Sequence, residues 1–189
     1  MSFFVVTFVA VAIGLWLVSF AVEALRPRPK VPKVLSWAPE IPIAYVDVGG
    51  FKLRYIRAGR GPTVVLLHTL RTRLDLFQKV VPRLTQRFTV YALDYPGHGF
   101  SDIPMERFDA GFFASSIEKF LSALDLRDVT LCGVSIGGAA ALIVAGRHNA
   151  RIARVVSINP YDYAPGPWDG AQFIRRLVDH DGSAHSDPR

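Results

Sequence analysis

Residues 131–142 read LCGVSIGGAAAL, and they contain a single serine, Ser135, with a glycine two positions away on either side. The apolar residues before the serine are typical of a buried strand, and the small apolar residues after it favour a helix. The pattern G-x-S-x-G predicts a sharp strand-to-helix turn with a strained backbone and an outward-facing hydroxyl. Side chains at Gly133 and Gly137 would collide with the neighbouring strand and helix. The alternative is a tight turn that needs glycine for packing only.

A second motif, LDYPGHGFSD at residues 93–102, lies upstream and follows the apolar run TVVLLH at 63–68. Together with the serine motif, and in this order, the two segments resemble the α/β-hydrolase superfamily in its esterase, lipase and haloperoxidase-like branch. The resemblance extends from about residue 44 to residue 160. It implies an α/β fold with a mostly parallel sheet covered by helices. Asp94 and His98 are expected to fix their turn through side-chain hydrogen bonds.

The resemblance also implies roles for individual residues. Ser135 is the expected nucleophile, and the backbone N–H groups of Ile136 and Thr69 are the expected oxyanion donors. The family usually has glycine at the second of these positions, where this chain has threonine. His68, which ends the predicted strand, is expected to be structural and not the general base.

The catalytic acid and base are harder to place. A serine hydroxyl is a poor nucleophile until a base accepts its proton, and in this fold the acid and then the histidine follow the serine. Asp162 follows a predicted strand and is the candidate acid. His148 lies at the far end of the helix that starts at the serine, and His180 and His185 lie in a polar tail. We therefore expect the first two-thirds of a hydrolase, truncated at the C-terminus, with little or no turnover.

Strand and helix patterns alternate along the rest of the chain. Two alternating runs around Gly49-Gly50 predict a hairpin. Further strands are predicted at 63–68, 88–94, 129–134 and 152–160, and helices at 74–87, 112–126, 137–148 and 171–179. Short-spaced alternation of this kind favours a parallel sheet covered by helices. Loss of the family's later strands would leave an open sheet edge with exposed apolar surface.

The first 22 residues, MSFFVVTFVAVAIGLWLVSFAV, carry no charged side chain. A helix of that length can cross a bilayer. A signal peptide is the alternative, with Ser19-Phe20-Ala21 as a loose cleavage site, although such peptides usually have a basic start and a shorter apolar run. We predict a transmembrane anchor and a single-pass membrane protein.

Four basic residues follow the apolar run directly: Arg26, Arg28, Lys30 and Lys33. A juxtamembrane cluster of this kind favours the cytoplasmic side, so the domain is predicted to be cytoplasmic. Recurrent prolines predict a semi-rigid extended spacer over residues 25–42. The single cysteine, Cys132, fits a reducing compartment, and its apolar neighbours predict a buried, inert thiol.

The net charge of +6 is largely explained by the juxtamembrane cluster. There is no basic stripe interleaved with aromatic residues, so we expect no nucleic-acid partner. Neither metal-ligand spacing nor a glycine-rich phosphate loop is present, so we expect no metal and no cofactor. Arg71 and Arg73 lie close after the strand at 63–68, where they are either solvated or available to an anionic substrate.

These patterns predict a membrane-anchored serine hydrolase that acts on an ester, thioester or amide of a small apolar molecule. Two alternatives use the same fold: a non-catalytic fragment or binding protein, and an acyltransferase that passes the acyl group from the serine to another acceptor. The predicted segments are a transmembrane anchor at 1–24, a proline-rich basic linker at 25–42, a hydrolase core at 43–160, and a partial lid with a disordered tail at 161–189.

Overall fold

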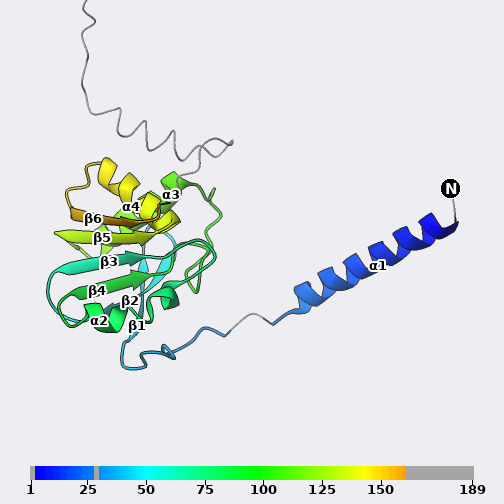
Figure 1. Cartoon of the computed structure of the whole chain (residues 1–189), viewed down its shortest axis with the longest axis horizontal. Coiled ribbons are helices and arrows are strands. Elements are labelled where there is room, and N and C mark those ends of the chain that lie inside the picture. The colour runs from blue at the N-terminus through cyan, green and yellow to red at the C-terminus, as the bar shows by residue number, and fades with distance from the viewer. Residues whose placement is uncertain (1–2, 28–29, 161–189) are drawn as a thin grey trace, which may run out of the picture. The chain divides into compact units, whose positions relative to one another are not determined.

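The computed structural model describes residues 3–27 and 30–160 of the chain. The chain divides into an N-terminal unit that ends at Pro32 and a larger unit that begins at Lys33. All the described strands belong to the larger unit (Figure 1).

The N-terminal unit contains one long helix, α1 (Phe3–Leu25). Its first charged side chain is Glu23, near the end of the helix, and this carboxylate pairs with Arg26 at 3.3 Å. The helix is long and apolar enough to cross a membrane, a property that signal sequences share. The predicted apolar helix is confirmed, whereas its insertion into a membrane stays a prediction.

The described strands form one sheet in the order β1-β2-β4-β3-β5-β6. Their bounds are β1 (Ile43–Asp47), β2 (Lys52–Ala58), β3 (Thr63–Leu67), β4 (Thr89–Leu93), β5 (Val129–Val134) and β6 (Ile152–Ile158). The pairs β1–β2 and β2–β4 are antiparallel, and the pairs from β4 through β3 and β5 to β6 are parallel. The predicted mostly parallel sheet is confirmed, as is the hairpin around Gly49-Gly50 that joins β1 to β2.

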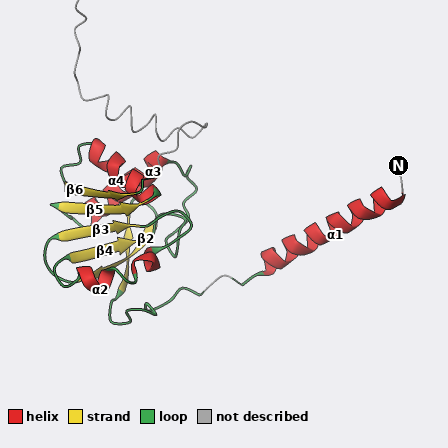
Figure 2. Ribbon diagram, viewed as in Figure 1, coloured by secondary structure: helices red, strands yellow, loops and turns green. Residues whose placement is uncertain are grey.

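Apolar clusters lie on both faces of this sheet. Helices α3 (Ala110–Ala123) and α4 (Ile136–Gly146) pack on one face, where α4 contacts β5, β6 and β3. The 3-10 turn η1 (Leu74–Phe77) and the short helix α2 (Val81–Leu84) pack on the other face (Figure 2). Strand β3 lies between these layers and is buried from Val64 to Leu67, as expected of a strand covered on both faces.

The single helix predicted over residues 74–87 is wrong in that form. The structure has η1 and α2 in its place, separated near Pro82. Proline lacks an N–H, and its ring clashes with the carbonyl four residues earlier, so it is tolerated only in the first turn of a helix. Pro82 occupies that position in α2. Leu76 and Val80, on either side of this break, are each 43% exposed.

The predicted spacer over residues 25–42 is shorter than expected. Leu35, Ala38 and Ile41 are each less than a tenth exposed, and they belong to the apolar cluster on the α2 face of the sheet. Their spacing of three residues places three apolar side chains on one side of the segment, which the prolines do not prevent. Trp37 adds a hydrogen bond from Nε1 to Asp75 Oδ1 at 2.6 Å. The second half of this segment is therefore part of the larger unit.

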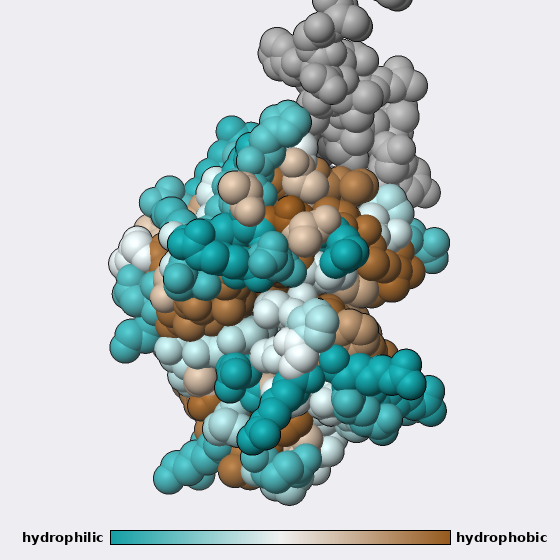
Figure 3. Space-filling view, turned by 90° about the vertical axis from the view of Figure 1, so that its left-hand side faces the viewer, coloured by the Kyte–Doolittle hydropathy of each residue, from teal (hydrophilic) through white to brown (hydrophobic). Residues whose placement is uncertain are grey.

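Strand β6 lies at one edge of the sheet in the part of the chain that the structure describes. Val156 is 45% exposed and Ile158 is 44% exposed, and they stand beside Cys132 and Val134 of β5 in the parallel register. Figure 3 shows hydrophobic residues at the surface between hydrophilic ones on the side of the molecule that it views. The thiol of Cys132, predicted to be buried, is only half-buried because this region of the sheet is open. Its partial burial still raises the pKa of the thiol.

Candidate active site

Ser135 occupies the turn between β5 and α4, as the sequence predicts. Its backbone has φ 56° and ψ −119°, a conformation that residues other than glycine rarely adopt. Two backbone hydrogen bonds fix the turn: the Ser135 N–H donates to Ile158 O at 2.9 Å, and the Ser135 carbonyl accepts from the Ala139 N–H at 3.0 Å. The Ser135 side chain does not cap the helix that follows. The Ser135 hydroxyl therefore forms no capping hydrogen bond in this turn.

The two glycines of the motif are required by close packing. A Cβ atom on Gly133 would overlap the Gly137 carbonyl oxygen, and a Cβ on Gly137 would overlap the carbonyl oxygens of Leu67 and His68. Both obstacles are backbone atoms, which cannot move aside as a flexible side chain does. This confirms the predicted steric reason for the glycines and places the first turn of α4 directly against the end of β3.

The same contact joins the two segments that contain the expected oxyanion donors. Ile136 begins α4, so its N–H has no partner within the helix. Thr69 follows His68, whose carbonyl lies against Gly137. Within the described residues, neither the Thr69 N–H nor the Ile136 N–H donates a hydrogen bond to another backbone group. Thr69 does not have a positive φ, so threonine meets no conformational obstacle at this position.

The imidazole of His68 is held in place on both sides. Nε2 accepts a hydrogen bond from the Tyr95 N–H at 3.1 Å, and Nδ1 lies 2.7 Å from the Thr69 carbonyl oxygen. An acceptor at Nε2 and a carbonyl at Nδ1 together require the neutral ring with its proton on Nδ1. Burial lowers the pKa of His68 to about 4. These contacts support the structural role expected of His68 and fix the backbone at Thr69.

The turn after β4 is organised by a buried carboxylate. Asp94 is fully buried and accepts hydrogen bonds from the Leu74 N–H at 2.7 Å and the Phe100 N–H at 3.0 Å. His98 adds a hydrogen bond between Nδ1 and the Pro96 carbonyl at 3.1 Å. The expectation that both side chains fix this turn is confirmed.

One buried residue of this region, Arg54, was not predicted from the sequence motifs. Its guanidinium is fully buried and pairs with Asp94 Oδ2 at 3.1 Å. The sequence did contain one indication of this burial. In strand β2 the charged Arg54 lies between Leu53 and Tyr55, two residues that face the core. The pairing itself joins residues 40 positions apart, and no local pattern reveals such a contact.

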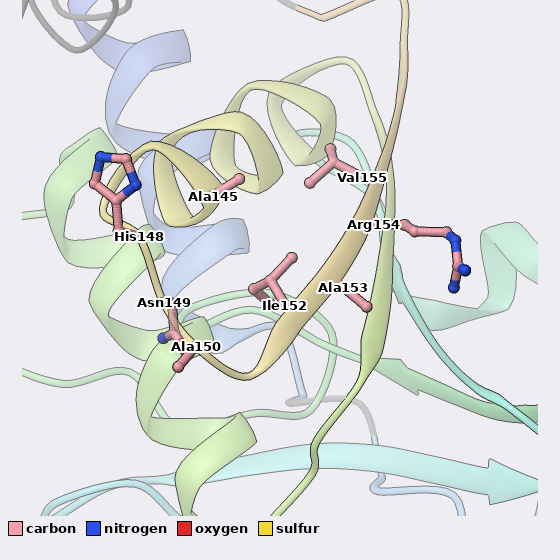
Figure 4. A pocket seen from close by; sticks show the side chains of 8 residues that line it. All are labelled: Ala145, His148, Asn149, Ala150, Ile152, Ala153, Arg154 and Val155. Carbon is pink, nitrogen blue, oxygen red and sulfur yellow. The ribbon is translucent and has the colours of Figure 1, made fainter. Parts of the chain in front are cut away.

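The structure does not bring a general base to Ser135 within the described residues. No described side chain hydrogen-bonds its hydroxyl. His148 follows the C-terminal end of α4, where it lines a separate hollow with Asn149 and Arg154 (Figure 4). The 11 residues of α4 separate it from Ser135 by about 16 Å along the helix axis. The candidate acid Asp162, and the two later histidines, lie outside the described residues.

Comparison with known proteins identifies the family. Residues 62–180 match a family model described as alpha/beta hydrolase fold. Because the match covers more than half of the chain, the protein belongs to the α/β-hydrolase family.

The individual relatives perform different reactions. The chain is 30% identical over 120 residues to 2-(acetamidomethylene)succinate hydrolase of Mesorhizobium japonicum, covering 64% of this chain and 42% of that one. It is 31% identical over 144 residues to the soluble epoxide hydrolase of a Corynebacterium species, covering 72% and 49%. A solved membrane phospholipase A superposes with a TM-score of 0.60 at 29% identity, covering 80% and 48%. The chain spans less than half the length of each of these proteins, and the relatives support a hydrolase without fixing its substrate.

Proposed function

We propose that the protein is a serine hydrolase that cleaves an ester or related acyl bond of a small molecule through Ser135. The observation that carries this proposal is the backbone of Ser135. The strained backbone of this serine, with a glycine required on each side, costs free energy that a turn needed only for packing would not have to spend. The strain is explained if the turn serves to expose a nucleophile.

The chemistry follows from the groups around this turn. The Ser135 oxygen attacks the carbonyl carbon of the substrate, and negative charge develops on the carbonyl oxygen. The N–H groups of Ile136 and Thr69 would donate hydrogen bonds to that oxyanion, and the N-terminus of α4 adds a partial positive charge. The alcohol leaves with a proton, and water then hydrolyses the acyl-serine. We assign the candidate acid to Asp162 and the base to His180 or His185, on chain order alone.

A p-nitrophenyl acetate assay tests the nucleophile, because this activated ester has a good leaving group and reacts with little help from a general base. We expect release of p-nitrophenol that depends on Ser135. The release should disappear in Ser135→Ala and persist in Ser122→Ala, a control at an exposed serine of α3. Equal release from the wild type and Ser135→Ala would refute the proposal.

We further propose that α1 anchors the protein in a membrane with the larger unit on the cytoplasmic side. The length of the helix and the basic residues Arg26, Lys30 and Lys33 after it support this orientation. Carbonate extraction should leave the chain in the membrane pellet, and protease added to spheroplasts should leave the domain intact. Release into the soluble fraction would contradict the anchor, and digestion of the domain would contradict its side.

A non-catalytic binding protein of the same fold is the second candidate. One observation favours it: no described side chain is positioned to deprotonate Ser135. The ester assay separates the two candidates, because a binding protein gives no release that depends on Ser135. An acyltransferase would show the same acylation and differ only in the acceptor.

A further inference from the structure

An open hollow of about 640 Å³ lies beside the loop that follows β3. One wall comes from this loop and η1, and the other comes from the glycine-rich turn after β4. The charged and polar side chains that line it are Arg71, Thr72, Arg73, Asp75, Gln78 and His98. A volume of this size accommodates a small molecule.

Arg71 supplies an unneutralised positive charge to the hollow. Its side chain is exposed, and no described residue forms an ion pair or hydrogen bond with it. Its φ of 58° is left-handed, a conformation that is uncommon for arginine. The loop is nevertheless fixed, because the Thr72 hydroxyl donates a hydrogen bond to the Thr69 carbonyl at 2.7 Å. Strained residues in fixed loops are concentrated at sites that bind ligands.

Arg73 is already oriented by its neighbours. It pairs with the Asp75 carboxylate, and its guanidinium lies over the Phe100 ring at 5.4 Å from the centroid. The other oxygen of Asp75 accepts the hydrogen bond from Trp37. Asp75 therefore neutralises one arginine and the charge of Arg71 remains, so the lining carries a net positive charge.

We propose that this hollow binds the anionic group of a small molecule, a carboxylate or a phosphate, with Arg71 as its main contact and Arg73 as the second. The planar fork of a guanidinium matches both anions. Arg71 lies two residues after Thr69, a span of at most about 7 Å of chain. The identification of this anion as part of an ester substrate rests on the proposed function, whereas the anion site does not.

The anionic group can belong to a soluble molecule or to a lipid headgroup. Binding of either one can be followed by the fluorescence of Trp37. Its indole is joined to Arg73 through Asp75, so an anion on the arginines should change its fluorescence. The full chain with Trp16→Phe and Trp168→Phe is placed in phosphatidylcholine nanodiscs and titrated with inorganic phosphate. We expect a saturable change, with Kd about tenfold weaker in Arg71→Asn. Arg83→Asn, at an exposed arginine of α2 outside the lining, should leave Kd unchanged.

Nanodiscs that contain phosphatidylglycerol distinguish the two sources. A fluorescence change without phosphate, reversed by Arg71→Asn, would identify a lipid headgroup; a change with phosphate alone would identify a soluble anion. Absence of a saturable change in both arms, or equal affinity of Arg71→Asn and the wild type, would overturn the site. Ser135→Ala should bind phosphate normally, so failure of the ester assay with intact phosphate binding would refute the proposed function and leave the anion site standing.

Discussion

At the scale of single residues, the molecule concentrates strain at Ser135. A non-glycine backbone held at φ 56° and ψ −119° costs on the order of 1–3 kcal/mol. The packing of Gly133 and Gly137 against backbone carbonyls leaves the turn no room to relax. The strained conformation is therefore imposed by the elements on either side of the serine.

Replacing Ser135 by glycine should release this strain. We expect Ser135→Gly to raise the free energy of unfolding by about 1 kcal/mol, since relief of strain exceeds the extra entropy of glycine in the unfolded chain. Ser122→Gly, in the ordinary helical backbone of α3, should instead lower it by about 0.5 kcal/mol. Denaturant unfolding measures both. Equal destabilisation by the two variants would mean that Ser135 is not strained.

His68 should make stability depend on pH. Its folded-state pKa of about 4 lies below the ordinary value of 6.5, so the unfolded chain takes up the proton first. The contribution of His68 to the free energy of unfolding is complete above pH 6.5 and is lost as the pH falls toward 4. The loss between pH 7 and pH 5 is roughly 2 kcal/mol. We expect this part of the loss to be absent in His68→Gln, compared by denaturant unfolding at both pH values. An unchanged pH dependence in the variant would contradict a neutral, buried imidazole.

Residue-level prediction worked where the decisive contacts are local. The turn at Ser135 and its need for two glycines can be predicted from five consecutive residues, although the backbone that Gly137 approaches, at Leu67 and His68, is distant in sequence. Arg54 could not be found in this way, because its partner Asp94 is distant in sequence. Strand β2 also contains Lys52 and Arg57, so the sequence does not show which of its three basic residues is buried.

At the scale of elements, the turn after β4 depends on the pair between Arg54 and Asp94. Removing one member leaves the other charge buried without a partner. We expect Asp94→Asn to cost about 3–5 kcal/mol of unfolding free energy, and the added change Arg54→Leu to recover part of that loss. A double-mutant cycle by denaturant unfolding measures the coupling. Additive effects of the two changes would show that the pair is not coupled.

The segment before β1 should contribute to the stability of the larger unit. Leu35 is 2% exposed in the cluster on the α2 face, so Leu35→Ala should cost about 2–4 kcal/mol. Its neighbour Val34 is 56% exposed, and Val34→Ala should change stability by less than about 0.5 kcal/mol. Thermal or denaturant unfolding compares the two. A spacer that does not pack would give two small, equal effects.

The errors at this scale have a common physical origin. Apolar periodicity predicts which side chains are buried, but it does not register backbone restrictions such as Pro82, which divides the predicted helix. In the segment before β1, proline content suggested an extended spacer, while the apolar spacing of Leu35, Ala38 and Ile41 determined the packing. The strands were easier to predict, because continuous apolar runs and the two motifs indicate the same segments.

At the scale of the whole molecule, the candidate nucleophile follows β5, and the neighbouring strand β6 lies at an edge of the sheet within the described residues. The turn at Ser135 stands between β5, which is partly covered, and α4, which is well packed. The α/β architecture could be predicted from the motifs and their order. The base could not be placed, because catalytic partners come from distant parts of the chain and short sequence patterns do not determine their positions.

Reaction with a fluorophosphonate probe tests whether Ser135 is the reactive nucleophile of this protein. The full chain is incubated with the probe and digested, and every serine adduct is mapped by mass spectrometry over time. We expect slow labelling confined to Ser135, abolished in Ser135→Ala and retained in Ser122→Ala. Labelling spread over several serines, or unaffected by Ser135→Ala, would contradict this role of Ser135.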